Sequence, residues 1–219
     1  MRKVILATPT YDHSVDVYYH HSVIETIKVC AENGIDVRPL SWPGEALVQH
    51  ARNALSSVVV ADHSVSDVFW VDSDQEWLPE QFMRLLSHPV DVVAAAYRKK
   101  TDDREQYTVR ASTIEILPNG LWKVDSVGTG FLRVSRKAMQ AAWEQSDPYQ
   151  HSDGTNHRMV FDVGVVDGRL WGEDTIFCAR LATCGFPIHV DPTFTVGHNG
   201  YKRYKGDFGE YIAKLKVKD

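Results

Sequence analysis

The chain has 219 residues, of which 43% are hydrophobic and 24% charged, and this ordinary globular composition excludes a disordered chain. Its 24 basic and 29 acidic residues give a net charge of -5 at pH 7, which disfavours a general nucleic-acid binder because such proteins need basic surface. Three cysteines (Cys30, Cys178 and Cys184) lack zinc-binding or CxxC spacing, so we expect free thiols in a reducing cytoplasm.

The sequence pattern gives no sign of a targeting or membrane segment. Only four apolar residues precede Thr8-Pro9, which is too short for the apolar region of a signal peptide. No apolar run approaches the roughly 20 residues that a membrane helix needs. We therefore expect a protein of the cytoplasm, or of the host cytoplasm if the source is viral, without a membrane span.

The first part of the chain alternates strand and helix patterns. Short apolar runs predict buried strands, and apolar residues at helical spacing predict helices. The strands are expected at 4–7, 35–40, 67–71 and 90–97, and the helices at about 16–33, 46–62 and 79–87. This order predicts a mainly parallel sheet with helices on both faces, because its strands are continuous apolar runs.

The second part is less regular. Residues 98–108 are highly charged and predict a mobile surface loop, whereas 113–127, with Pro118-Asn119-Gly120 at the centre, predicts a β-hairpin. A strand at 131–134 and a helix at about 135–145 follow, and the polar residues 146–158 predict a loop. A last helix is expected from Gly172 to Gly185, before a polar, locally basic tail that starts at Tyr201.

Asp72-Ser73-Asp74 follows the third strand directly. Ligands collect at the carboxyl ends of parallel strands, and two carboxylates there can converge on one divalent cation with open positions for phosphate oxygens. The alternative without a functional role is an ordinary turn, because Asp is favoured in turns. Trp77 replaces the glycine that an EF-hand loop requires, and Glu76 departs from the pattern of aspartyl phosphotransferases, although that second alternative stays open.

Other nucleotide and hydrolase motifs are absent from the sequence. Gly128-Thr129-Gly130 lacks a third glycine and opens a strand, so it is not a dinucleotide-binding fingerprint. There is no phosphate-binding loop of the GxxxxGK type, no HExxH motif and no GxSxG motif.

Two downstream segments carry further candidate residues. Glu173 and Asp174 open a helix, where the macrodipole favours carboxylates, but either can also serve as a general base in a cleft. His198 lies in the segment Gly197–Gly200, which we expect to be flexible, and can supply a third metal ligand. The cations at 202, 203 and 205 either belong to a solvated tail or neutralise a phosphate leaving group.

This ordered set resembles the nucleotide-sugar glycosyltransferases of the GT-A fold, in their broad family-2-like group. The resemblance covers roughly residues 3–205, and the compact size is similar to that of small viral or phage members. The positions that carry the resemblance are 7–11, 72–74, 128–131, 172–174 and 197–198. No single motif is specific, but their order and spacing are.

The resemblance implies one GT-A domain over 1–219: an α/β, Rossmann-like, mainly parallel sheet with a small β-hairpin insertion. It divides this domain into a nucleotide-binding half (about 1–97), an acceptor and catalytic half (about 98–200) and a basic tail (201–219). It implies donor contacts from Thr8, Pro9, Thr10, Tyr11, Arg52, Asn53, Asp72, Ser73, Lys202, Arg203 and Lys205.

The same resemblance implies the chemistry of the site. Asp72, Asp74 and His198 would bind Mn²⁺ or Mg²⁺, with Asp74 the more direct ligand. Asp174, beside Glu173, would be the base of an inverting enzyme, while Gly130 and Trp171 would contact the acceptor.

The sequence therefore predicts a metal-dependent glycosyltransferase that moves a sugar from a nucleoside diphosphate, with UDP favoured, to a hydroxyl acceptor. The acceptor could be a glycan, a protein, a lipid-linked sugar or a modified DNA base. Three alternatives stay open: a nucleotidyltransferase or phosphotransferase that uses the same Asp pair, a non-catalytic nucleotide-sugar binding module, and a retaining mechanism.

Overall fold

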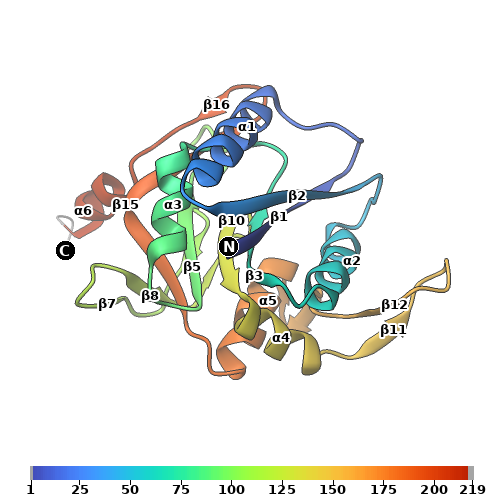
Figure 1. The fold of residues 1–219 in the computed structure, drawn as a ribbon. Helices are drawn as coiled ribbons and strands as arrows, with labels where there is room; N and C mark the ends of the chain where they lie inside the picture. Colours follow the sequence, from blue (N-terminus) through green and yellow to red (C-terminus); the bar gives the residue numbers. More distant parts are fainter. Residues whose placement is uncertain (1, 217–219) are drawn as a thin grey trace.

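A central mixed sheet with helices on both faces dominates the computed structural model, which describes residues 2–216 (Figure 1). The ten strands of the sheet are β1 (Arg2–Thr10), β2 (Ile35–Pro43), β3 (Val65–Val71), β4 (Gln75–Glu76), β5 (Val92–Tyr97), β7 (Glu115–Ile116), β8 (Trp122–Val124), β10 (Phe131–Ser135), β15 (Ile188–Asn199) and β16 (Arg203–Tyr204). No helix within the described residues is both long and apolar enough to cross a membrane.

Six helices and three small two-stranded ribbons complete the described part of the chain. The helices are α1 (Val17–Glu32), α2 (Val48–Ala61), α3 (Pro79–Ser87), α4 (Arg136–Glu144), α5 (Glu173–Thr183) and α6 (Phe208–Lys216). The ribbons pair β6 (Val109–Arg110) with β9 (Ser126–Val127), β11 (Pro148–Gln150) with β12 (Asn156–Arg158), and β13 (Gly164–Val166) with β14 (Arg169–Trp171).

The main path of the sheet runs β2-β1-β3-β10-β5-β15-β8-β7. Strand β1 pairs in parallel with β2 and β3, and β5 pairs in parallel with β15, whereas β10 lies antiparallel between β3 and β5. The predicted α/β fold with a mainly parallel sheet is confirmed. The reversed direction of β10 sets Phe131 opposite Val71, so the glycine segment before β10 lies beside the residues that follow β3.

Both faces of the sheet are buried, which explains the continuous apolar runs in its strands. Val4 and Leu6 of β1 belong to the core that contains α1 and α3, whereas Ile5 and Ala7 belong to the core that contains α2, α4 and α5. Each large apolar side chain buried in this way contributes about 1.5–3 kcal/mol to folding.

Local sequence signals set the ends of several helices. The Asp16 carboxylate caps α1 by accepting from the Tyr18 N–H at 2.8 Å, and the helix ends before Gly34, whose φ of 70° suits glycine. The Ser135 hydroxyl caps α4 in the same way, through the Ala138 N–H at 3.2 Å. These signals explain why the predicted helix ends lie close to the observed ones.

Several predictions for the connections were wrong. The predicted loop 146–158 contains the β11–β12 hairpin, and the segment expected to be flexible around His198 is the end of the twelve-residue strand β15. The charged segment 98–108 is anchored by a bridge between Arg98 and Tyr107, and the Tyr107 side chain is buried. The predicted hairpin at 113–127 is present as β7 and β8.

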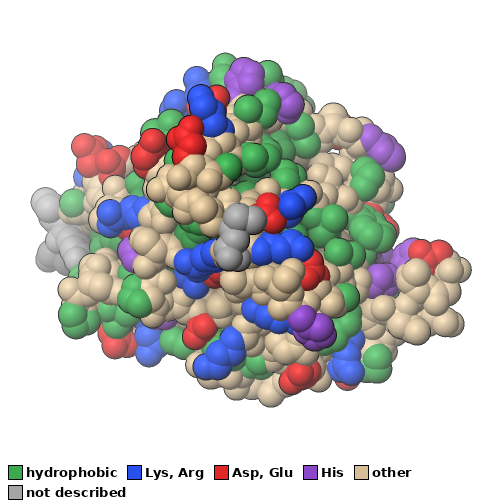
Figure 2. All heavy atoms as spheres, viewed as in Figure 1, with side chains coloured by type: hydrophobic (Ala, Val, Ile, Leu, Met, Phe, Trp, Pro, Cys, Tyr) green, Lys and Arg blue, Asp and Glu red, His purple; other side chains and the backbone are tan. Residues whose placement is uncertain are grey.

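The surface is mixed rather than divided by charge. Basic, acidic and hydrophobic side chains are interspersed over the face seen in Figure 2, and histidines gather over α1 and beside the β11–β12 hairpin. No single large basic field covers this face.

A buried charge pair ties three strands together. Asp67 of β3 accepts from Arg133 of β10 at 2.8 Å and from Arg2 of β1 at 2.9 Å, and the Asp67 and Arg133 side chains are almost fully buried. Removing one member of such a pair leaves an uncompensated buried charge.

We expect Asp67→Ala to lower the free energy of unfolding by about 3–5 kcal/mol, because Arg133 would lose its counter-charge inside the sheet. Urea unfolding at pH 7 measures the change. The matched control is Glu115→Ala, which removes an exposed partner of Lys123 and should change stability by less than about 1 kcal/mol. Equal effects of the two substitutions would contradict this account of the sheet.

Candidate active site

A cleft of about 290 Å³ opens at the carboxyl ends of β1 and β3. Its lining residues are Pro9, Thr10, Tyr11, Glu45, Ala46, Val48, Arg52, Asp72, Ser73, Asp74 and Glu173. Ligands of α/β sheets collect at this edge, where strand ends from distant parts of the sequence converge. The cleft therefore brings together the residues after the first strand, the aspartate pair and the start of the late helix.

Arg52 joins the two acidic segments of the cleft. The buried guanidinium of this α2 residue donates to Asp72 Oδ1 and to Glu173 Oε1, each at 2.6 Å. Burial lowers the pKa of Arg52, but the charges of Asp72 and Glu173 outweigh burial and raise it, so the guanidinium stays charged. A single arginine thus holds the end of β3 against the first turn of α5.

Asp72 depends on this partner for its charge. The pKa of Asp72 is raised overall: burial raises it most, Arg52 lowers it, and the nearby Asp74 raises it again. The Arg52 contact therefore favours the ionised carboxylate in a place where two like charges lie close together.

Asp74 faces His198 at the end of β15. His198 Nε2 lies 3.5 Å from Asp74 Oδ1, and the backbone carbonyl of Arg98 lies 2.8 Å from His198 Nδ1. A carbonyl can only accept, so Nδ1 carries a proton, and Nε2 is the ring nitrogen that faces the Asp74 carboxylate. Asp74 Oδ1 is buried, and no described residue donates a hydrogen bond to it.

Lys100 supplies a positive charge on the other side of Asp74. Its Nζ lies 2.5 Å from Asp74 Oδ2 and comes from the charged segment 98–108. Burial raises the pKa of Asp74, but His198 and Lys100 outweigh burial and lower it. The Asp74 carboxylate is therefore ionised, and Lys100 is its ion-pair partner.

Tyr97 explains the two glycines before β10. The Gly130 N–H donates to the Tyr97 hydroxyl at 3.0 Å, and a Cβ at Gly130 would lie 2.7 Å from both that hydroxyl and Asp72 Oδ2. A Cβ at Gly128 would also clash with the Tyr97 ring and hydroxyl. Gly130, predicted to contact an acceptor, thus lies against Asp72 and leaves the room that this carboxylate needs.

The two carboxylates of α5 have different surroundings. Glu173 lines the cleft and is bound by Arg52. Asp174 accepts from the N–H of Thr175 at 2.6 Å, and no ion pair joins it to another described residue. Asp174 is not among the residues that line the cleft; its charge is the last of the contributions that raise the pKa of Tyr97, after burial and Asp72.

Two residues predicted to bind the donor lie beneath the surface instead. The Thr8 hydroxyl is fully buried, 2.6 Å from the hydroxyl of Tyr19. The buried Asn53 amide bonds both the N–H and the carbonyl of Phe161, at 2.8 and 2.9 Å. These side chains hold the walls of the cleft, and neither lines it.

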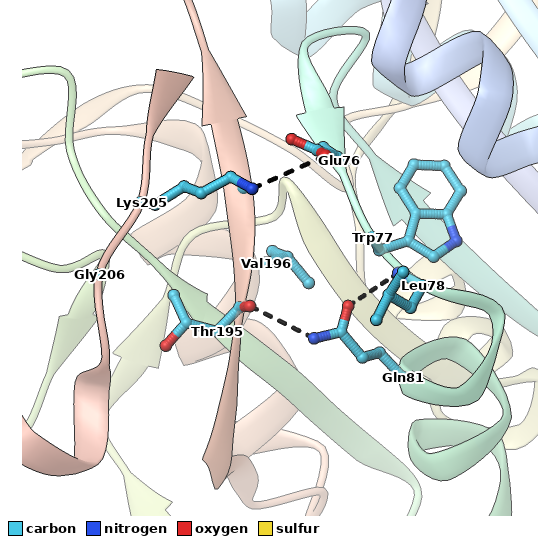
Figure 3. A pocket seen from close by; sticks show the side chains of 9 residues that line it. Glu76, Trp77, Leu78, Gln81, Thr195, Val196, Lys205 and Gly206 are labelled. Atoms are coloured by element: carbon cyan, nitrogen blue, oxygen red, sulfur yellow. Dashed lines mark hydrogen bonds and ion pairs between the residues drawn. The ribbon is translucent and has the colours of Figure 1, made fainter.

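The three tail cations lie outside the cleft. Lys202 pairs with Asp102 at 2.5 Å, and Arg203 pairs with Glu76. Lys205 lies 4.0 Å from Glu76 in a separate pocket of about 270 Å³, between β4, the start of α3 and β15 (Figure 3). The structure therefore joins these cations to other carboxylates and not to Asp72 or Asp74.

Sequence reasoning missed several residues in and around the site. Tyr97 ends a predicted strand, so its position at the carboxyl edge was a signal that it belongs near the cleft. Lys100 was hidden in a run of charges, and nothing in the local sequence marked Glu45 as a cleft residue. Trp171, expected to contact an acceptor, ends β14 directly before α5 and does not line the cleft.

Comparisons with known proteins support the fold. No protein-family model matches the sequence, and no curated protein matches it. Among solved structures, A197 from STIV is 16% identical, with a TM-score of 0.54 over 91% of this chain and 86% of that one. The catalytic domain of Drosophila beta1,4-galactosyltransferase 7, solved with xylobiose, is 14% identical, with a TM-score of 0.54 over 97% of this chain and 80% of that one. The chain thus has a glycosyltransferase-like fold, as the sequence predicted.

We expect Arg52→Met to lower the free energy of unfolding by about 3 kcal/mol, because Asp72 and Glu173 would face each other without their shared cation. Arg52→Lys should recover only part of this loss, since an ammonium lacks the planar fork that reaches both carboxylates. Urea unfolding at pH 7 measures both variants. A change no larger than that of Arg38→Met, which removes an exposed arginine, would contradict the role of Arg52.

Proposed function

We propose that this protein is a metal-dependent glycosyltransferase that moves a sugar from a nucleoside diphosphate, UDP first among the candidates, to a hydroxyl acceptor. The observation that carries the proposal is the joining of Asp72, Asp74 and Glu173 at one cleft, with His198 beside Asp74, in a glycosyltransferase-like fold. Such a reaction needs charge stabilisation on the leaving diphosphate and a base for the acceptor hydroxyl.

The residues present fit a divalent cation. Asp74 Oδ1 is buried without a hydrogen-bond donor and faces Nε2 of His198, while Asp72 lies beside them. Carboxylate and imidazole ligands suit Mn²⁺, and a mainly carboxylate set suits Mg²⁺. When bound, this ion would neutralise the negative charge that develops on the leaving diphosphate.

The donor would lie along the wall formed by the end of β1. Pro9, Thr10 and Tyr11 line the cleft there, and the Tyr11 ring is 74% exposed. An exposed aromatic ring can stack on a nucleobase of any kind, so Tyr11 would bind the base without selecting which base it is. Lys100, close to Asp74, is the cation best situated to meet a phosphate, in place of the tail cations first predicted for that role.

The acceptor would be activated by Asp174. Glu173 is paired with Arg52, whereas Asp174 has no ion pair among the described residues. We assign Asp174 as the base that takes the acceptor proton and Glu173 as a positioning residue. The β13–β14 hairpin leads directly into α5 and exposes Val165 and Leu170, so we propose that this hairpin contacts the acceptor.

We expect Asp74→Ala to abolish the strengthening of UDP binding by Mn²⁺, because the variant loses a direct ligand of the ion. Calorimetry with UDP should show at least about tenfold tighter binding with Mn²⁺ in the natural sequence, about 1.4 kcal/mol, and no difference in the variant. Asp103→Ala, an exposed aspartate outside the cleft, is the control and should behave like the natural sequence. An undiminished Mn²⁺ effect in Asp74→Ala would contradict the assignment.

We expect Asp174→Asn to keep donor binding and lose about 10²–10⁴-fold in turnover, because an amide cannot accept the proton. The assay follows UDP release with a mixture of glycan, peptide and lipid-linked acceptors, together with sugar incorporation into the product. Release of pyrophosphate or inorganic phosphate instead of UDP would indicate a nucleotidyltransferase or phosphotransferase. Unchanged turnover in Asp174→Asn would remove this residue from the mechanism.

A further inference from the structure

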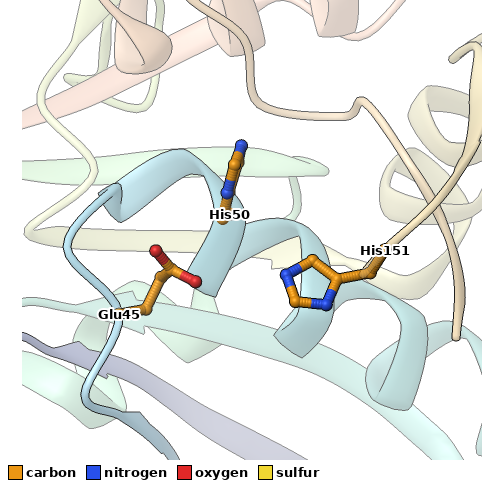
Figure 4. A group of neighbouring side chains, drawn as sticks. All are labelled: Glu45, His50 and His151. Carbon is orange, nitrogen blue, oxygen red and sulfur yellow. The ribbon is translucent and has the colours of Figure 1, made fainter. Parts of the chain in front are cut away.

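A second group of metal-ligating side chains lies at the outer rim of the cleft. Glu45, His50 and His151 each offer one ligand atom, and these atoms all lie within 4.8 Å of one another. They come from the loop before α2, from α2 itself and from the tip of the β11–β12 hairpin (Figure 4). All three side chains are partly buried, and this group shares no residue with the Asp74–His198 pair.

The donor set indicates the kind of metal. Two imidazoles and one carboxylate suit Zn²⁺, which takes nitrogen and oxygen ligands, and they do not suit Mg²⁺, which prefers oxygen ligands. A tetrahedral zinc ion with bonds of about 2.0 Å separates its ligand atoms by roughly 3.3 Å, so the three side chains need only small rotations to bind it. A fourth position would remain open to water or to another ligand.

His151 has the outer partner that zinc-binding histidines commonly have. Asp153 Oδ1 accepts from Thr155 and lies 3.3 Å from His151 Nδ1, at ion-pair distance but without a hydrogen bond to it, and in Figure 4 the other ring nitrogen faces Glu45 and His50. A carboxylate beside one ring nitrogen orients the imidazole and raises its basicity as a ligand at the other nitrogen. The tip of the hairpin is itself fixed by a tight turn, in which the Gly154 N–H donates to the His151 carbonyl at 2.9 Å.

The position of these three side chains would let a bound ion connect two parts of the fold. Glu45 lines the donor cleft, and the neighbouring Gly44 N–H donates to the Thr10 carbonyl at 3.0 Å. An ion held by Glu45, His50 and His151 would therefore join the β11–β12 hairpin to the wall of the cleft. The hairpin has only three residues in each strand, too few to be stable alone, so such a link would order it.

We propose that Glu45, His50 and His151 form a zinc site that fastens the β11–β12 hairpin to the rim of the cleft. This inference stands on the side-chain cluster alone and does not depend on the proposed glycosyl transfer.

The test uses the full chain carrying Asp74→Ala, which removes the first proposed metal site. After treatment with a chelator, the protein is titrated with Zn²⁺ alone by calorimetry and with Co²⁺ alone by visible absorption. We expect one equivalent of Zn²⁺ to bind and Co²⁺ to give the visible bands of a four-coordinate site. Asp153→Asn, which loses the outer partner, should weaken Zn²⁺ binding by roughly 10–100-fold. His151→Gln, which loses a direct ligand, should weaken it by more than that.

The control is His20→Gln, which changes an exposed histidine of α1 outside the cluster and should leave Zn²⁺ binding unchanged. Amide hydrogen exchange supplies a second measurement on the chain with its three ligands intact, because bound Zn²⁺ should slow exchange in residues 148–158. The proposal is overturned if the Asp74→Ala protein binds no Zn²⁺, or if His151→Gln and His50→Gln bind it as tightly as His20→Gln. Circular dichroism confirms that each variant is folded.

Discussion

The contact of Arg52 with Asp72 and Glu173 is the interaction on which the candidate site depends. The guanidinium lies beneath the cleft and joins the end of β3 to the beginning of α5. Without this charge, two carboxylates from distant parts of the sequence would repel each other where the donor is expected to bind. The same contact holds the first turn of α5, where Asp174 follows Glu173 and has no ion pair among residues 2–216.

The sheet supports this contact through its topology. Because β10 runs antiparallel between β3 and β5, its first residues return to the carboxyl edge and bring Gly130 against Asp72 and Tyr97. The long strand β15 ends at the same edge and carries His198 to Asp74. Buried apolar residues on both faces make the edge rigid, which lets polar side chains there keep fixed distances.

Much of the fold could be predicted because its signals are local. Apolar runs and caps such as Asp16 mark the strands and helices of the first half, and the position of Asp72 after a buried strand marks the edge of the sheet. The order of the motifs predicted that four residues would lie together: Asp72, Asp74, Glu173 and His198. A sequence contains no distances, so it could not predict their geometry. The direction of β10 could not be predicted, since strand pairing depends on contacts between distant segments.

The remaining differences between the predicted and the observed positions of side chains have a common physical cause. Thr8 and Asn53 were expected in the cleft, but at the ends of β1 and within α2 the direction of a side chain is set by packing, which turns Thr8 to Tyr19 and Asn53 to Phe161. The tail cations were expected near the diphosphate, but strand pairing between β15 and β16 carries Arg203 to Glu76. Lys100 and the cluster at His151 arise from folding of charged and polar segments that have no periodic pattern.

The most direct test of the central claim is a crystal structure of the protein with UDP and Mn²⁺, with data collected to give the anomalous signal of manganese. This account predicts one manganese peak beside Asp74 and His198, and a diphosphate in the cleft between Tyr11 and Lys100. A diphosphate bound elsewhere, such as in the pocket beside Glu76 and Lys205, with no manganese at Asp74, would contradict it.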